Sequence, residues 1–290
     1  MGRWACWLIA AAAMLWGIIA VFVKGLAAYG FSPIQVVAVR VAVSAVGLVA
    51  YTAAADRKAL VVRPADGGYF IGTGIVSIIF FNWCYFTAIE TTSVGVAAVL
   101  LYTAPAFVAV LSRVVFGERI TGRKAAAVAV TFVGCALVAG LLPGFSGAVR
   151  PLGLLAGLGA GLGYALYSIF GKLALKRYGA LTVTTYTFVF AAAAILPFSG
   201  LWDQRALFAA WQVWWYGAGL GVVSTVLAYL LYTVGLKYVE PGRAAVTATL
   251  EPLVAAALGA AVFGEALTGW QLAGMALVIA AVAGVQERAG

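Results

Sequence analysis

Val115-Phe116-Gly117-Glu118, followed by Thr121-Gly122, is a stretch that this sequence of 290 residues contains twice. It returns 147 residues later as Val262-Phe263-Gly264-Glu265, followed by Thr268-Gly269. At that offset, 15 of the 35 positions from Gly95 to Ala129 are identical, and a proline stands in the same place in both copies. The chain therefore contains an internal repeat of two copies, and this duplication governs how its topology is interpreted.

The composition predicts a helical membrane protein. Hydrophobic residues make up 65% of the chain and charged residues 9%, which leaves too little polar surface to cover a soluble globule. Apolar runs of about 20 residues have the length that crosses a bilayer as a helix. We expect ten such spans, at residues 4–23, 32–52, 67–86, 94–112, 125–142, 152–170, 180–197, 211–233, 243–262 and 269–285.

The positive charges predict how these spans are oriented. With ten spans, 14 of the 18 lysines and arginines fall on the side of the N-terminus and three on the other side, with Arg40 inside the second span. Short loops rich in Lys and Arg stay cytoplasmic. We therefore expect both termini inside (N-in/C-in) in a cytoplasmic (inner) membrane. The net charge of +9 is a topology signal, and a nucleic-acid partner is not expected.

Each copy of the repeat holds five spans, one in residues 1–142 and the other in 151–290. Because five is odd, the second copy enters the membrane from the opposite side. The two form an inverted pair, and such pairs place a substrate site near the midplane and expose it to each side in turn.

Two of the eight prolines lie in the middle of a span, Pro105 in the fourth and Pro252 in the ninth. A proline inside a helix frees a backbone carbonyl and kinks the axis. The matched positions predict a hinge beside a central cavity, whereas a kink that serves packing alone is the other interpretation.

Two ionisable residues lie at mid-depth, Arg40 and Glu251. A charge there costs about 2.5–3.5 kcal/mol even on lenient scales, so both should face the bundle interior. They either form an ion pair, which could be structural, or bind the two ends of a zwitterion. Glu251 is the one carboxylate inside a predicted span, which makes it the candidate for proton coupling. Its repeat mate, the residue 147 positions earlier, is Ala104.

Aromatic and amide side chains are expected to line the same space, although ordinary helix packing would also use them. The candidates for substrate binding, together with the two charged residues, are Trp16, Arg40, Asn82, Tyr85, Tyr102, Tyr164, Tyr229, Tyr232 and Glu251. Glu118 and Glu265 are expected to secure tight turns at the helix ends instead.

Catalytic and metal chemistry have little support in this sequence. Cys6, Cys84 and Cys135 lie in apolar spans without metal-ligand spacing, and the chain has no histidine. No phosphate loop, HExxH or GxSxG motif is present. We expect neither an enzyme nor a bound cofactor.

The order of several short motifs resembles the EamA family of the drug/metabolite transporter superfamily. In the first half these are Leu15-Trp16-Gly17, the stretch from Pro33 to Arg40, Pro105, and Gly117-Glu118-Arg119-Ile120. In the second half they are Gly163-Tyr164-Ala165, Leu250-Glu251-Pro252 and Phe263-Gly264-Glu265. The resemblance implies a ten-helix secondary transporter with both termini inside, usually an exporter of amino acids or related metabolites.

We therefore expect alternating-access export of a small polar metabolite, with amino acids or their derivatives favoured. Two alternatives stay open: an importer or exchanger of sugars or nucleoside-type solutes, and a membrane scaffold or lipid-handling subunit that transports nothing. The expected partners are the solute, the lipid bilayer and a coupling proton, and a homodimer is compatible with the sequence.

Overall fold

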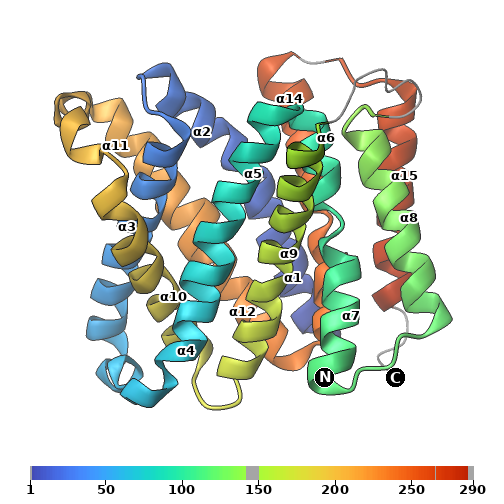
Figure 1. Cartoon of the computed structure of the whole chain (residues 1–290), viewed down its shortest axis with the longest axis horizontal. Coiled ribbons are helices and arrows are strands. Elements are labelled where there is room, and N and C mark those ends of the chain that lie inside the picture. The colour runs from blue at the N-terminus through green and yellow to red at the C-terminus, as the bar shows by residue number, and fades with distance from the viewer. Residues whose placement is uncertain (1, 142–149, 265, 287–290) are drawn as a thin grey trace.

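The computed structural model describes residues 2–141, 150–264 and 266–286, and this part of the chain is helical (Figure 1). The first half contains α1 (Gly2–Gly17), α2 (Ile19–Ala28), α3 (Pro33–Ala55), α4 (Gly67–Phe70), α5 (Phe80–Thr91), α6 (Val94–Leu101), α7 (Ala104–Phe116) and α8 (Gly122–Val138). The second contains α9 (Pro151–Ala174), α10 (Ala180–Ile195), α11 (Trp211–Ala218), α12 (Ala228–Tyr238), α13 (Pro241–Ala248), α14 (Glu251–Phe263) and α15 (Gly269–Gln286). Two π-helical segments, Ile71–Ile79 and Gly219–Leu227, join α4 to α5 and α11 to α12.

Within the described residues, eight helical stretches are long and apolar enough to cross a membrane. They are Trp4–Ala28, Pro33–Ala55, Pro64–Thr91, Val94–Phe116, Pro151–Ala174, Ala180–Phe198, Trp211–Tyr238 and Pro241–Val262. The other two predicted spans coincide with α8 and α15, of 17 and 18 residues, near the lower limit for a transmembrane helix. The third span is longer than predicted, and Asp66 and Glu90 therefore lie near its ends.

The repeated tag marks where one helix ends and the next begins. Gly117 and Gly264 close α7 and α14 in the left-handed conformation, with φ of 70° and 69°, which glycine adopts without a steric penalty. The side chains of Thr121 and Thr268 then accept a hydrogen bond from the backbone of the first turn of α8 and α15. The glycine makes the turn, and the carboxylate of Glu118 lies 3.6 Å from the ammonium of Lys124 in the first turn of α8. Glu265 lies outside the described residues.

The two mid-span prolines lie just after a break in the helix. α6 ends at Leu101 and α7 begins at Ala104, and in the second half α13 ends at Ala248 and α14 begins at Glu251. Each proline is the second residue of its new helix, where its missing N–H leaves no hydrogen bond unmade. The same break occurs in both halves, whereas a break between α1 and α2 at Ile18 has no counterpart in the unbroken α9.

Small residues bring α9 close to the helices of the first half, as its glycine stripe predicts. A Cβ at Gly161 would lie 3.0 Å from the carbonyl oxygen of Leu100, and one at Gly163 would lie 3.0 Å from the Cα of Phe81. The two halves therefore meet backbone to backbone along α9, and the cavity lies beside this contact.

Candidate functional site

A cavity of about 690 Å³ lies between the two halves of the chain. Its lining comes from α1, α2, α3, α5, α6 and α8 of the first half and from α9, α12, α14 and α15 of the second. At one end of the cavity are exposed residues at the ends of helices or in the loops beside them: Lys24, Ala27, Val94 and Ala266. We call this end the rim, and in Figure 1 it lies at the upper edge, where α2 ends and α6 begins.

Arg40 projects into this cavity from α3 and is partly buried. Its Nε donates a hydrogen bond of 2.8 Å to the hydroxyl of Thr225, and its guanidinium lies 5.9 Å from the centre of the Tyr229 ring. Thr225 is held in turn by donating to the carbonyl of Leu220, five residues earlier in the π-helical segment. The π-helix thus turns a buried hydroxyl toward Arg40, and Tyr229 is a second polar neighbour of the guanidinium.

Glu251 is the first residue of α14 and lines the same cavity. Its carboxylate accepts a hydrogen bond of 3.3 Å from the hydroxyl of Tyr164. Between residues that the structure describes, no ion pair joins Glu251 to Arg40, so these two opposite charges line one cavity without direct contact. The backbone of Glu251 also packs closely on α1, where a Cβ at Gly17 would lie 2.9 Å from its carbonyl oxygen.

The bottom of the cavity, opposite the rim, is aromatic. The ring centres of Trp16 lie 6.1 Å from Tyr164 and 5.1 Å from Tyr229, with the rings edge to face. Tyr229 packs in the same way on Phe188 and Tyr167, each at 5.0 Å. These contacts come from helices of both halves. We call the three cavity-lining members of this cluster, Trp16, Tyr164 and Tyr229, the floor.

Eight of the nine predicted binding residues line the cavity: Trp16, Arg40, Asn82, Tyr85, Tyr102, Tyr164, Tyr229 and Glu251. The ninth, Tyr232, does not. It is 1% exposed behind the floor, and its hydroxyl shares a hydrogen bond of 2.7 Å with Ser168. Tyr232 follows Tyr229 by three residues on the same face of α12, so its side chain lies almost one turn farther along the helix, where it is buried behind the floor.

The prolines differ in their place at the cavity. Pro252 lines it directly beside Glu251, whereas Pro105 borders a separate void of about 10 Å³ together with Ala104. The two breaks are thus alike in backbone, but one places the charged Glu251 at the large cavity, whereas the other places Ala104 at the separate void.

Three polar residues near the cavity escaped the sequence analysis. Thr225 bonds Arg40, while Lys24 and Gln271 line the cavity near the rim. Thr225 had a usable signal, because Ser77 in the first half lies 147 residues before Ser224 and 148 before Thr225. Ser77 also holds the halves together by donating to the carbonyl of Gly163 at 2.8 Å.

No cluster of three or more metal-ligating side chains occurs in the described parts of the chain. Cys6, Cys84 and Cys135 are buried free thiols. The chemistry of this cavity rests on Arg40 and Glu251, on Lys24 near the rim, and on hydroxyls and aromatic faces.

Comparison with known proteins shows which family has this architecture. The model of the EamA-like transporter family matches residues 3–140 and matches again at residues 151–286. This chain belongs to the EamA-like transporter family. The family predicted from the motifs is therefore confirmed, and with it a multi-pass membrane protein from a family of transporters.

Named relatives agree with this assignment. An uncharacterized transporter of Archaeoglobus fulgidus is 36% identical over 68% of this chain and 69% of its own length. The threonine/homoserine exporter RhtA of Escherichia coli (strain K12) is 30% identical over 70% of this chain and 66% of its own. A crystal structure with 19% sequence identity superposes with a TM-score of 0.80 over 98% of this chain and 96% of that chain, which shows a shared fold.

Proposed function

We propose that this protein is a secondary active transporter that exports small zwitterionic metabolites, amino acids or their derivatives, across the cytoplasmic membrane. The observation that carries the proposal is the pair of separate charges, Arg40 and Glu251, in the one cavity of about 690 Å³. A buried charge that lacks a partner is costly in a membrane, and a ligand with the opposite charge removes that cost.

The two charges match the two ends of an amino acid. The guanidinium of Arg40 carries its N–H donors in a planar fork, a shape that suits a carboxylate held through two hydrogen bonds. The carboxylate of Glu251 uses one hydrogen bond from Tyr164, and its remaining lone pairs can accept from an ammonium group. The aromatic floor would then receive the side chain of the substrate. The name of the relative RhtA, an exporter of threonine and homoserine, supports the same substrate class.

The membrane topology belongs to the proposal. We infer ten spans, with α8 and α15 crossing the bilayer, arranged as two inverted repeats of five helices in residues 1–142 and 151–290. The excess of Lys and Arg on the side of the N-terminus supports placing both termini in the cytoplasm. On that assignment the rim of the cavity faces outward, and the described arrangement is an outward-open state.

For movement between an outward-open and an inward-open state, we propose that the helices bend at the two paired breaks. Each break leaves a few residues without continuous helical hydrogen bonds, which is where a helix can bend at low cost. Pro105 and Pro252 mark these places, one in each half. Glu251 lies directly beside the second break, so its protonation is suited to couple a proton to the movement.

Flux measurements on the full chain in liposomes test this function. We expect saturable transport of labelled amino acids, competed by other amino acids but much less by amino-acid amides, which lack the carboxylate. Arg40→Gln should weaken binding roughly 10- to 100-fold, because hydrogen bonds between charged groups contribute about 1.5–3 kcal/mol. Glu251→Gln should weaken it similarly and remove any dependence of flux on a proton gradient.

Glu90→Gln is the matched control, because Glu90 is an exposed carboxylate of α5 that does not line the cavity. It should leave flux unchanged. Competition by sugars or nucleosides in place of amino acids would favour the exchanger alternative. No flux and no thermal shift with any solute of a broad panel would favour a scaffold. If Glu251→Gln kept the proton dependence of the native chain, Glu251 would not be the coupling residue.

A further inference from the structure

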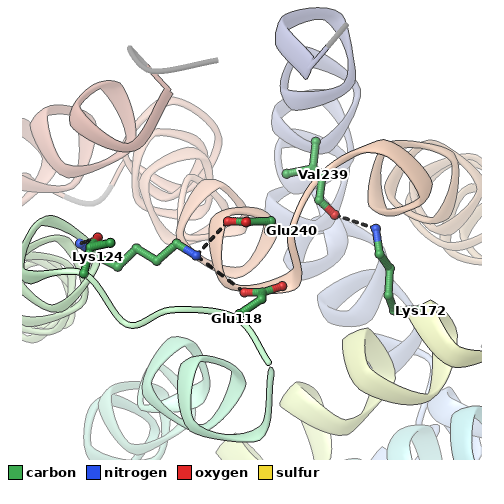
Figure 2. Close-up of polar contacts among 6 residues, drawn as sticks. Glu118, Lys124, Lys172, Val239 and Glu240 are labelled. Atoms are coloured by element: carbon green, nitrogen blue, oxygen red, sulfur yellow. Dashed lines mark hydrogen bonds and ion pairs between the residues drawn. The ribbon is translucent and has the colours of Figure 1, made fainter. Parts of the chain in front are cut away.

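A bridge of charges joins the two halves at the face opposite the rim (Figure 2). The ammonium of Lys124 lies 2.6 Å from the carboxylate of Glu240 and 3.6 Å from that of Glu118. Glu118 and Lys124 belong to the first half and Glu240 to the second. We call these three residues the Lys124 bridge.

The bridge connects the elements that surround the cavity. Glu118 directly follows α7, Lys124 lies in the first turn of α8, and Glu240 precedes α13. α7 and α13 are the segments of the two broken helices that run away from the rim, and α13 packs on α7 and α8. To open this face, α13 would have to move away from α7 and α8, and that movement separates Lys124 from Glu240.

The face is closed in this structure. Beside the bridge remains a space of about 10 Å³, bordered by Gly242 and Val246, which is room for about one water molecule. The side chains of Lys124 and Glu118 are 19% and 11% exposed, against 53% for Glu240. The bridge therefore covers the one end of the molecule at which the large cavity has no rim.

Two residues of the bridge differ in charge from their repeat mates, while Glu265, the mate of Glu118, lies outside the described residues. The repeat mates of Lys124 and Glu240 are Gln271 and Ser93, both uncharged. Gln271 lines the cavity near the rim, and its amide donates a hydrogen bond to the carbonyl of Val138. An ammonium that bridges two carboxylates on one face thus corresponds to a neutral amide on the other.

From these contacts between the two halves we propose that the Lys124 bridge is an ionic lock on the cytoplasmic face, which favours the outward-open arrangement of the empty transporter. The proposal rests on the alternating access proposed above. The lock must break in every transport cycle. An ion pair with partial exposure shifts an equilibrium by up to about fivefold, which is enough to decide which of two otherwise balanced states predominates.

Cysteine labelling tests the lock without any substrate. The background is the full chain with its three cysteines replaced by alanine. One cysteine is then placed at Val246, buried beside the bridge, or at Ala98, which lines the cavity on the rim side. A membrane-impermeant maleimide is applied to vesicles of either orientation, so that each face is labelled separately.

We expect Lys124→Gln, which introduces the residue found at the repeat mate, to raise labelling at Val246 up to about fivefold and to lower labelling at Ala98. Glu240→Gln, at a half-exposed position that is tolerant in folding, should do the same. The exchange Lys124→Glu with Glu240→Lys should restore the native rates at both cysteines.

Lys58→Gln is the matched control, because Lys58 is an exposed lysine on the loop after α3 that belongs to no ion pair in the described chain. It should leave both rates unchanged. Native rates in Lys124→Gln and Glu240→Gln would overturn the lock. So would a rise at Val246 without a fall at Ala98, because that reports local loosening and no change of state. These outcomes are independent of which solute is carried, so a failed amino-acid assay and a failed lock are distinguishable.

Discussion

Replacement of Gly274 by alanine should loosen the contact between α8 and α15. These two helices pack through glycines, Gly134 on α8 and Gly274 on α15. A Cβ at Gly274 would lie 2.6 Å from the carbonyl oxygen of Gly134, 2.7 Å from the Cβ of Leu137 and 2.9 Å from the backbone nitrogen of Val138. Ordinary contacts begin at 3.4 Å, so the helices would have to separate by about 0.8 Å.

The size of the effect follows from two opposing contributions. Overpacking against backbone atoms costs about 1–3 kcal/mol, since neither helix can move a flexible side chain out of the way. Alanine gains about 0.5–1 kcal/mol over glycine within a helix. We therefore expect a net loss of about 1–2 kcal/mol, which corresponds to a fall in Tm of about 2–8 °C for a chain of this size.

Thermal unfolding of the purified protein in detergent measures this change. The matched control is Gly47→Ala in the middle of α3, where a Cβ would meet no heavy atom within 4 Å. It should keep or raise the Tm, because helix propensity acts there alone. Equal shifts in the two variants would refute the reasoning, since they would show that backbone contact between α8 and α15 contributes nothing.

Three further substitutions separate structural roles from functional ones. Tyr232→Phe breaks a buried hydrogen bond to Ser168 and should lower stability by about 1 kcal/mol without changing substrate affinity, because its side chain lies behind the floor; an altered affinity at native stability would contradict this. Lys172→Met removes an ammonium that donates to three backbone carbonyls at the end of α12. It should lower the Tm more than Lys176→Met does, because the ammonium of Lys176 contacts a phenylalanine ring. Equal losses of Tm would argue against capping by Lys172. Burial raises the pKa of Glu118 above its ordinary 4.5, against the attraction of Lys124. Folding therefore favours the uncharged form relative to the unfolded chain, and this contribution to stability is lost as pH rises through the raised pKa. The advantage in Tm of the native chain over Glu118→Gln should therefore shrink as pH rises from 4.5, and an advantage that grows with pH would reverse this conclusion.

Most of the site could be predicted because its members carry strong local signals. A charge in an apolar run, such as Arg40 or Glu251, must face the interior of the bundle whatever the details of packing. Aromatic residues at matched positions in the two halves were also found, with the exception of Tyr232. Its error has a simple cause: a shift of three residues along α12 leaves the repeat alignment intact but changes which neighbours the side chain meets.

The lock and the hydrogen bond from Arg40 to Thr225 were not predictable in the same way. Lys124 and Glu240 are 116 residues apart, and Arg40 and Thr225 are 185 apart. The alignment with Ser77 marks a polar position near Thr225, but neither local stretch shows which distant charge each of these residues meets. The role expected for Glu118 at the helix end did not include the other half of the chain: its carboxylate lies near Lys124, which also pairs with Glu240.

By itself, the sequence determined the duplication, the apolar helices, the helix stops at the repeated Phe-Gly-Glu tag and the family. These features follow from hydropathy, backbone preference and helix capping, and each of these depends on residues that are close in the sequence. The tertiary structure alone decided which face is open, which charges stay apart and which are bridged. Those properties depend on how each helix is rotated about its axis and on what the other half places opposite it, and the energies of such contacts exist only after the two halves have packed.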